Sequence, residues 1–441
     1  MKKFWFDALL NTIFVFAVMI GLYGVSQLNI FSAFDPLGKA LGDMELSDIA
    51  FSQLRNDPAI DTNIVIVNIG ELSRGGIGQQ IMTLAQFKPK VIGLDIIFSC
   101  DWLQDSLNCP QAYDVFDNMV FSTAVSMAPN MVMAEKIWQT DSLVSALGDT
   151  DVYDSIEHTY PTLLQSAYEG FVNLETNAEH QEDIKACRRF NPSLTVNDEK
   201  HYAFGVKMAM IYDSVKTKKF LERGNASEII NYRGNIVDWF GASTYPGRYP
   251  VLDWEQALDT SQFVHGMIKD KIIIMGYLGR DLRDTSWDDK FFTPLNKIYA
   301  GRARPDMYGV VVHANITSMI LTEDYVNEIK LWHQIVIAFF VVLLNIALFK
   351  VINRKIPIWY DGLSLLIQVA QVLIFSLLMV QFFNWWSFKF NITFTLLAVA
   401  LVGTCFELYN SLMKTLFTYI NELITKRRNA VLSTESDQSI E

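Results

Sequence analysis

Apolar positions along the chain gather in four long runs. The first is Phe4–Val25, whose apolar core from Ala8 onward is long enough to cross a bilayer of about 30 Å as a helix. Three more runs follow late in the chain, at 331–349, 363–383 and 390–406. We therefore predict an α-helical membrane region with one N-terminal and three C-terminal transmembrane helices.

A cleaved signal peptide is the alternative for the first run, since Lys2 and Lys3 would form its charged start. The apolar stretch is longer than the usual 7–15 residues or so of such a peptide, and no A-x-A-like cleavage site follows it. We expect an uncleaved anchor at 4–25.

Basic residues beside the runs set the expected orientation. They precede the first run, fill the link between the second and third, and follow the fourth. Because Lys and Arg accumulate on the cytoplasmic side of membrane proteins, residues 1–3, 350–362 and 407–441 are expected in the cytoplasm. The segment 26–330 and the turn 384–389 are expected outside it. This arrangement places the protein in a bacterial inner membrane, with its large domain in the periplasm.

Short buried strands and helices alternate within 26–330. NIVIVNIG (63–70) and PKVIGLDIIFS (89–99) indicate buried strands with a helix between them, a β-α-β unit that normally makes parallel neighbours. Further strands are predicted in EIINYRG and DKIIIMGYLG, and a helix in HANITSMIL. We predict an α/β domain with a mostly parallel open sheet flanked by helices, in which 101–228 is irregular.

Polar residues follow the predicted strands, where open α/β sheets bind their ligands. Candidate ligand contacts are Asn68, Glu71, Asp95, Arg233, Asp281, Asp284, Thr293 and His313. Asp281, Asp284 and Thr293 offer oxygen atoms to a cation or polar ligand, although loop capping explains them equally well. Asp95 needs a partner because burying an unpaired carboxylate is costly, and we expect a backbone N–H group, Arg233 or His313 in that role.

His313 and Asn315 lie in YGVVVHANITSMIL, about ten residues before the second apolar run. If YGVVV closes the last connection of the sheet, both residues lie at or near the first turn of a helix. Asn315 would cap backbone N–H groups there, and His313 would hold a neighbouring strand. The alternative is a ligand contact or a proton-sensitive switch at His313. We expect this helix to couple the outer domain to the membrane.

Net charge, cysteine positions and the lack of catalytic motifs exclude several classes of function. The net charge of −12 and the lack of a basic stripe exclude nucleic acid as a partner. Cys100 and Cys109 flank a polar loop that a disulfide can close. The sequence does not decide whether this disulfide forms. No spacing indicates a zinc site and no nucleophile–base pair is evident. We therefore expect no catalytic residue, no metal and no cofactor.

Polar and apolar patterns near the C-terminus indicate contacts within and beyond the membrane. Gln368 and Gln371 share one helical face, and polar side chains in lipid usually join helices. After the last run, Leu412, Leu416 and Leu423 repeat at a spacing that favours a short coiled seam, with a membrane-surface helix as the alternative. The final stretch, NAVLSTESDQSIE, is expected to be disordered.

Several motifs in order resemble the type 2 CHASE domain, an extracellular sensory domain of bacterial membrane proteins. They are IVIVNIG, KVIGLDIIFS, INYRG, DKIIIMG…D, FTPL and YGVVVHANITSMIL, preceded by LSDIAFSQLR. The resemblance covers about 30–330 and includes the layout of one span before and three after. It implies a ligand-sensing domain that is normally joined to a cytoplasmic cyclase, histidine kinase or Ser/Thr kinase.

This chain departs from that pattern after the fourth run. Residues 409–441 are too few for a kinase or cyclase domain and carry no kinase or nucleotide-binding motif. We therefore expect a sensor, without a fused output domain, that binds a small ligand or periplasmic protein and acts on a separate cytoplasmic or membrane effector. It could act as a homo-oligomer in the lipid bilayer. The alternative is a structural or scaffolding subunit of a cell-envelope membrane complex.

Overall fold

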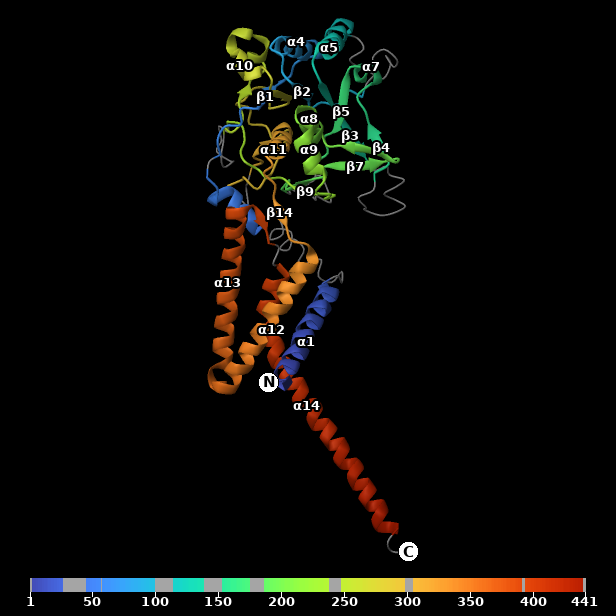
Figure 1. The fold of residues 1–441 in the computed structure, drawn as a ribbon, viewed down its shortest axis with the longest axis vertical. Coiled ribbons are helices and arrows are strands. Elements are labelled where there is room, and N and C mark those ends of the chain that lie inside the picture. Colours follow the sequence, from blue (N-terminus) through green and yellow to red (C-terminus); the bar gives the residue numbers. More distant parts are fainter. Residues whose placement is uncertain are drawn as a thin grey trace. The chain divides into compact units, whose positions relative to one another are not determined.

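The computed structural model divides the chain into two compact units (Figure 1). The membrane unit comprises Met1–Leu41 and Asn327–Glu441, and the α/β unit comprises Gly42–Val326. The structure describes residues 2–26, 45–56, 58–99, 114–138, 153–174, 186–237, 247–297, 304–390 and 393–438.

A seven-stranded mixed sheet forms the centre of the α/β unit. Its strands are β1 (Ile64–Asn68), β2 (Val91–Leu94), β3 (Met131–Trp138), β4 (Ser155–Glu157), β5 (Ala167–Phe171), β10 (Val251–Leu252) and β11 (Ile272–Gly276). The order is β10-β1-β11-β2-β3-β4, with β5 also paired to β3. Strand β4 runs antiparallel to β3, and the other pairs in this sheet are parallel. The α/β class predicted from the sequence is confirmed.

Helices cover both faces of the sheet, which explains why its central strands are buried throughout (Figure 1). Helices α4 (Arg74–Ala85) and α5 (Val115–Met127) pack on one face, where Ile81 and Phe121 join the apolar core. Helices α8 (Phe204–Tyr212), α9 (Ser214–Leu221) and α11 (Gly309–Leu321) lie on the other side. Every residue of α11 is buried.

Shorter elements complete the α/β unit. They are α3 (Leu46–Ile49), η2 (Ala50–Leu54), α7 (Pro161–Leu164), β6 (Arg189–Phe190), β7 (Ser193–Val196), β8 (Glu199–Tyr202), β9 (Glu228–Ile229), η4 (Gln256–Leu258), η5 (Thr260–Gln262), α10 (His265–Ile268), β12 (Lys290–Phe291) and β13 (Met307–Tyr308). The segment EIINYRG was predicted as a strand of the main sheet. It instead contributes only β9, which pairs with β6 outside that sheet.

Two other sequence predictions differ from the structure. The middle region, predicted to be irregular, contains β3, α5, β5 and α8. Its strand MVMAEKIW lacks a strong β pattern and forms because β2 and β5 pair with it on either side. Helix α11 begins at Gly309, so Asn315 lies inside the helix rather than in its first turn. Tertiary burial overrides the strand preference of Val310, Val311 and Val312 here.

Among the described residues of the membrane unit, four helices are long and apolar enough to cross a bilayer. The helices are α1 (Lys2–Ser26), α12 (Leu331–Lys355), α13 (Tyr360–Trp386) and α14 (Thr393–Gln438), with η6 (Pro357–Trp359) between α12 and α13. The link predicted at 350–362 is therefore mostly helical. Strand β14 (Asn327–Glu328) pairs in parallel with β15 (Phe388–Lys389), a contact that the sequence did not suggest.

Polar side chains join the membrane helices. Gln368 on α13 donates to the carbonyl oxygens of Val399 (3.0 Å) and Ala400 (3.1 Å) on α14. A Cβ at Gly403 would lie only 2.7 Å from the Gln368 Oε1, so glycine permits this approach. The Gln371 Oε1 is buried without a hydrogen-bond partner among the described residues.

A second polar link connects three helices of the membrane unit. Asp7 on α1 forms an ion pair with Lys350 on α12 and accepts a hydrogen bond from the Tyr409 hydroxyl on α14 (3.3 Å). Any movement of one of these helices therefore bears on the other two.

Helix α14 continues far beyond its apolar part. It reaches Gln438, whereas the sequence predicted disorder from Asn429 onward. Extending a formed helix costs little for each added residue, which accounts for the difference. Leu412 and Leu416 are about half exposed, and the side chain of Leu423 lies outside the described residues.

Candidate functional site

Three loops line an open pocket of about 430 Å³ at the carboxyl edge of the sheet. They follow β1, β10 and β11, which are parallel neighbours, so these strand ends lie side by side. The pocket is lined by Glu71, Leu72, Asp253, Trp254, Glu255, Arg280 and Asp281. Two of the residues predicted from the sequence, Glu71 and Asp281, therefore belong to its wall.

Asn68, at the end of β1, ties the three loops together. Its Nδ2 donates to Asp253 Oδ1 (2.8 Å) and to the carbonyl oxygen of Gly279 (3.1 Å). Its Oδ1 accepts from the backbone N–H groups of Gly70 (2.9 Å) and Leu278 (2.9 Å). All four hydrogen-bonding positions of this fully buried amide are used. Asn68 therefore shapes the pocket and has no capacity left for a ligand.

Trp254 forms one wall of the pocket because glycine stands opposite it. Gly70 has φ +55, and a Cβ there would lie 3.0 Å from the Trp254 indole. The Trp254 backbone N–H donates to Asp253 Oδ1 (2.9 Å), and its carbonyl oxygen accepts from Gln80 Nε2 (3.1 Å). The indole is thus held by a fixed backbone.

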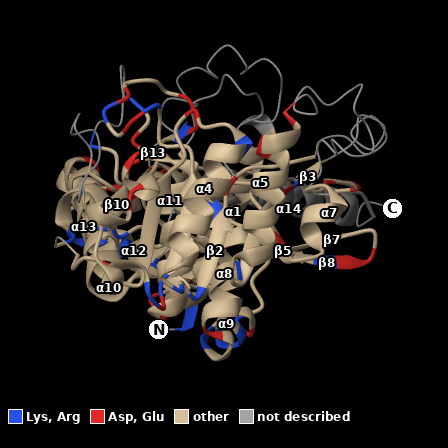
Figure 2. Ribbon diagram, turned by 90° about the horizontal axis from the view of Figure 1, so that it is seen from above, with Lys and Arg blue, Asp and Glu red and all other residues tan. Residues whose placement is uncertain are grey.

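The charges of the pocket are mainly negative. Four carboxyl side chains line it, against one guanidinium. Glu71 and Arg280 form an ion pair at 3.3 Å, but both are more than two-thirds exposed, so this pair contributes little to stability. Acidic and basic segments lie together on the loops beside β10 (Figure 2). An aromatic wall beside several carboxylates favours a cationic ligand.

Asp281 and Asp284 organise the loop after β11. Asp281 Oδ1 accepts from the Arg283 N–H (2.7 Å), and Asp284 accepts from the N–H groups of Arg280 (2.9 Å) and Ser286 (2.8 Å). The bonds from Arg280 and Ser286 hold the pKa of the Asp284 carboxyl below its usual value. Loop capping, one of the two roles considered for these residues, is what the structure shows.

The family model of the CHASE2 domain matches residues 15–348, from within α1 to within α12. The chain belongs to the CHASE2 family. CHASE2 is a family of sensory domains, and the matched residues include the whole α/β unit. No curated protein and no solved structure matches the chain.

Thr293 makes its contacts away from the pocket lining of the CHASE2 domain. Its N–H (2.8 Å) and Oγ1 (2.6 Å) both donate to Asp306. Burial raises the pKa of Asp306 to about 7, although these bonds oppose the rise. Thr293 thus supports a buried carboxyl group, and the predicted grouping of Thr293 with Asp281 and Asp284 is wrong.

Arg233 and Asn315 fasten an extended segment of the CHASE2 domain to α11. The Arg233 guanidinium pairs with Asp324 (Nε–Oδ2 2.7 Å), and its backbone N–H donates to Asn315 Oδ1 (3.0 Å). Asn315 Nδ2 donates in turn to the carbonyl oxygens of Gly234 and Val311, both at 3.0 Å. Neither residue lines the pocket, and the predicted first-turn capping role of Asn315 is wrong.

His313 is buried in α11 with its ring edge-on to Phe204, at 5.3 Å between ring centres. Its Nδ1 has no hydrogen-bond partner among the described residues. Burial lowers the pKa of this imidazole to about 3, so it stays neutral at physiological pH. The buried position of His313 and its lowered pKa disfavour a proton switch near neutral pH and fit the structural role.

Asp95 follows β2 and lies beside Gly276 of β11, on the same edge of the sheet as the pocket. The expected pairing with Arg233 or His313 is wrong, since Arg233 binds Asp324 and His313 packs on Phe204. The Asp95 carboxyl makes no hydrogen bond or ion pair in the described part of the chain. Burial, and then the nearby Asp289, raise the pKa of Asp95 to about 8.

Five residues of the pocket were not predicted from the sequence: Leu72, Asp253, Trp254, Glu255 and Arg280. Asp253 and Trp254 follow β10, which has only two residues and gives no periodic signal. Arg280 follows the turn after β11, where only the acidic residues Asp281 and Asp284 were predicted as ligand contacts. Cys100 and Cys109, the proposed disulfide pair, lie outside the described residues.

Gly279→Ala should destabilise the CHASE2 domain more than Gly224→Ala. Both glycines have positive φ (+90 and +67), so both substitutions carry a backbone penalty of about 1 kcal/mol. A Cβ at Gly279 would also overlap the Asp284 side chain, whereas nothing lies within 4 Å at Gly224. Unfolding curves of the two variants test this, and equal destabilisation would contradict the described loop.

Proposed function

We propose that this protein is a membrane-bound receptor whose CHASE2 domain lies outside the cytoplasm and binds a small ligand carrying an amino group. The observation that carries the proposal is the acidic pocket with its Trp254 wall at the carboxyl edge of the sheet. Asn68 holds the pocket in shape without a ligand, so little ordering is needed when a ligand binds. The proposed role is binding and relay rather than catalysis.

The proposed signal passes through the membrane helices to a separate cytoplasmic effector. Basic residues in the last turns of α12 support this orientation in a bacterial inner membrane, since Lys350, Arg354 and Lys355 follow the positive-inside rule. The Asp7–Lys350–Tyr409 link supports the coupling of three helices. A ligand would need to bind two states with affinities that differ by about 1–3 kcal/mol. Exposed Leu412 and Leu416 on α14 offer a surface to the effector.

Ligand binding can be tested with the purified full chain and a panel of amino acids and linear diamines. We expect at least one amine to raise the unfolding temperature in proportion to its concentration, as any ligand of the folded state does. Trp254→Ala should abolish this shift, because the indole is the aromatic face for the cation.

Trp287→Ala is the matched control, since Trp287 is about half exposed and lies outside the pocket lining. A shift that survives Trp254→Ala, or that Trp287→Ala removes equally, would contradict binding in this pocket. Failure of every amine would favour the alternative of a structural subunit of an envelope complex.

A further inference from the structure

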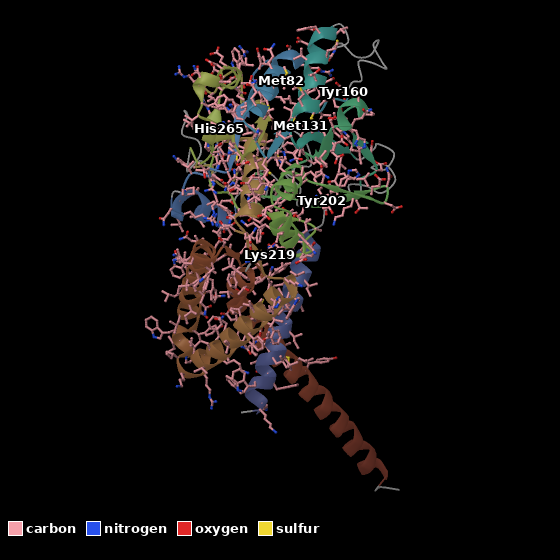
Figure 3. The ribbon with its side chains drawn as sticks, turned by 45° about the horizontal axis from the view of Figure 1, so that its top comes forward. Met82, Met131, Tyr160, Tyr202, Lys219 and His265 are labelled. Atoms are coloured by element: carbon pink, nitrogen blue, oxygen red, sulfur yellow. The ribbon has the colours of Figure 1, made fainter. Side chains whose placement is uncertain are left out.

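Two glutamates and a histidine meet at the far side of the sheet from the pocket loops. Glu135 is on β3, Glu169 is on β5 beside it, and His158 directly follows β4. One side-chain atom of each of the three lies within 4.8 Å of the other two. Tyr160, Tyr202 and Met131 in Figure 3 mark the segments that carry His158, the neighbouring His201 and the start of β3.

Each carboxylate has one oxygen held by a donor and a second oxygen directed at His158. Glu135 Oε1 lies 3.1 Å from His201 Nδ1, and Glu169 Oε1 accepts the Thr159 N–H at 3.0 Å. The second oxygens of Glu135 and Glu169 lie 3.4 Å and 2.9 Å from His158 Nδ1. Such fixed orientation by outer groups is what ligands of a metal ion require.

The Glu135 side chain provides the independent indication of a ligand. Only 2% of it is exposed, and its Oε2 has no hydrogen-bond partner among the described residues. A buried carboxylate oxygen without a donor is costly, and a second carboxylate beside it adds repulsion.

We propose that Glu135, His158 and Glu169 bind a divalent first-row transition-metal ion of the zinc type. Two ligands on a tetrahedral ion with bonds of about 2.1 Å lie about 3.4 Å apart, close to the spacings found here. A mixed set of one imidazole and two carboxylates suits such an ion better than magnesium or calcium, which prefer oxygen alone. His158 is 48% exposed, so the ion can enter from solvent.

The alternative to a metal site is a hydrogen-bond network in which His158 donates to one of the two carboxylates. One imidazole N–H can satisfy Glu169 at 2.9 Å but leaves the buried Glu135 Oε2 without a donor at 3.4 Å. An ion satisfies both oxygens together. It would also clamp β3, β5 and the segment after β4, independently of whatever binds the pocket.

Sequence spacing does not reveal this site, because positions 135, 158 and 169 match no local metal motif. The three side chains converge only through the pairing of β3 with β4 and β5. The expectation of no metal rested on spacing alone, and the proposal replaces it.

The test uses the full chain in lipid nanodiscs, with a tag that contains no histidine and with its solvent-accessible thiols alkylated. After treatment with EDTA and desalting, Zn²⁺ is titrated by calorimetry and Co²⁺ by its visible d–d absorption. We expect one equivalent of Zn²⁺ to bind and Co²⁺ to give a low-symmetry spectrum. His158→Gln and Glu169→Gln should each weaken binding at least tenfold and remove the cobalt spectrum.

His265→Gln is the matched control, since His265 is exposed on α10 and should bind as the parent chain does. Both test variants keep polar side chains at partly exposed positions, so they should fold, and metal-free unfolding temperatures check this. Absence of Zn²⁺ binding by the parent chain, or equal affinity in His158→Gln and Glu169→Gln, would overturn the proposal. Loss in the control as well would overturn it too, because the ion would then bind elsewhere.

Discussion

Asn68→Ala should lower the free energy of unfolding of the CHASE2 domain by about 3 kcal/mol. The substitution removes four hydrogen bonds made by one fully buried amide. It leaves the buried N–H groups of Gly70 and Leu278 and the Gly279 carbonyl without their partner. The three loops of the pocket then lose their common anchor, so ligand binding should fall together with stability.

Chemical unfolding followed by tryptophan fluorescence measures this effect. Gln79→Ala is the control, because Gln79 is exposed on α4 and should change stability by less than about 0.5 kcal/mol. Asn68→Asp should destabilise at least as much as Asn68→Ala, since it retains an acceptor but places a carboxylate opposite Asp253. An Asn68→Ala variant as stable as the control would contradict the role of Asn68 as the anchor of the three pocket loops.

Asp95→Asn should stabilise the CHASE2 domain at pH 8, by about 2 kcal/mol, and should change little near pH 4. The folded-state pKa of Asp95 is about 8, whereas an unfolded aspartate titrates near 3.8. Between these values the folded state holds a proton that the unfolded state has lost. Stability therefore falls as pH rises through this window, and asparagine removes this slope. Asp95 keeps some exposed surface, which limits the size of the effect.

Unfolding free energies at several pH values between 4 and 8 test this sign. Asp198→Asn serves as control, because Asp198 is exposed and asparagine tolerates its positive φ equally well. Asp289 and Asp306, with pKa values raised by burial to about 6 and about 7, contribute slopes of the same sign in both proteins. A parallel pH dependence in the parent chain and Asp95→Asn would contradict a buried, protonated Asp95.

The sequence predicted those parts of the fold that carry strong local patterns. Strands β1 and β11 are buried on both faces and apolar apart from Asn68 at the end of β1, and the membrane helices are long apolar runs. Strand β10 has two residues and β3 contains residues of weak strand preference, so only their neighbours in the sheet define them. The start of α11 was missed because its β-branched residues favour a strand locally, whereas burial decides for a helix.

Prediction of the pocket had the same limit. The rule that ligands collect at the carboxyl edge of a sheet drew on Glu71 and Asp281, which line the pocket, and their contact with a ligand stays a prediction. The rule could not separate residues that face a ligand from residues that hold the loops. Asn68 and Asp284 belong to the second group, and only their hydrogen bonds in the folded chain show this. Arg233, Thr293 and His313 belong to other contacts that depend on how α11 packs.

The most direct test of a receptor with a separate effector is affinity purification from native membranes, followed by mass spectrometry. The full chain is compared with a chain that ends at Leu408, which removes the part of α14 that continues beyond its apolar run. The account predicts that a cytoplasmic kinase, cyclase or regulator copurifies with the full chain and is lost from the truncated chain. Recovery of the same envelope proteins with both chains, and of no cytoplasmic regulator with either, would contradict it.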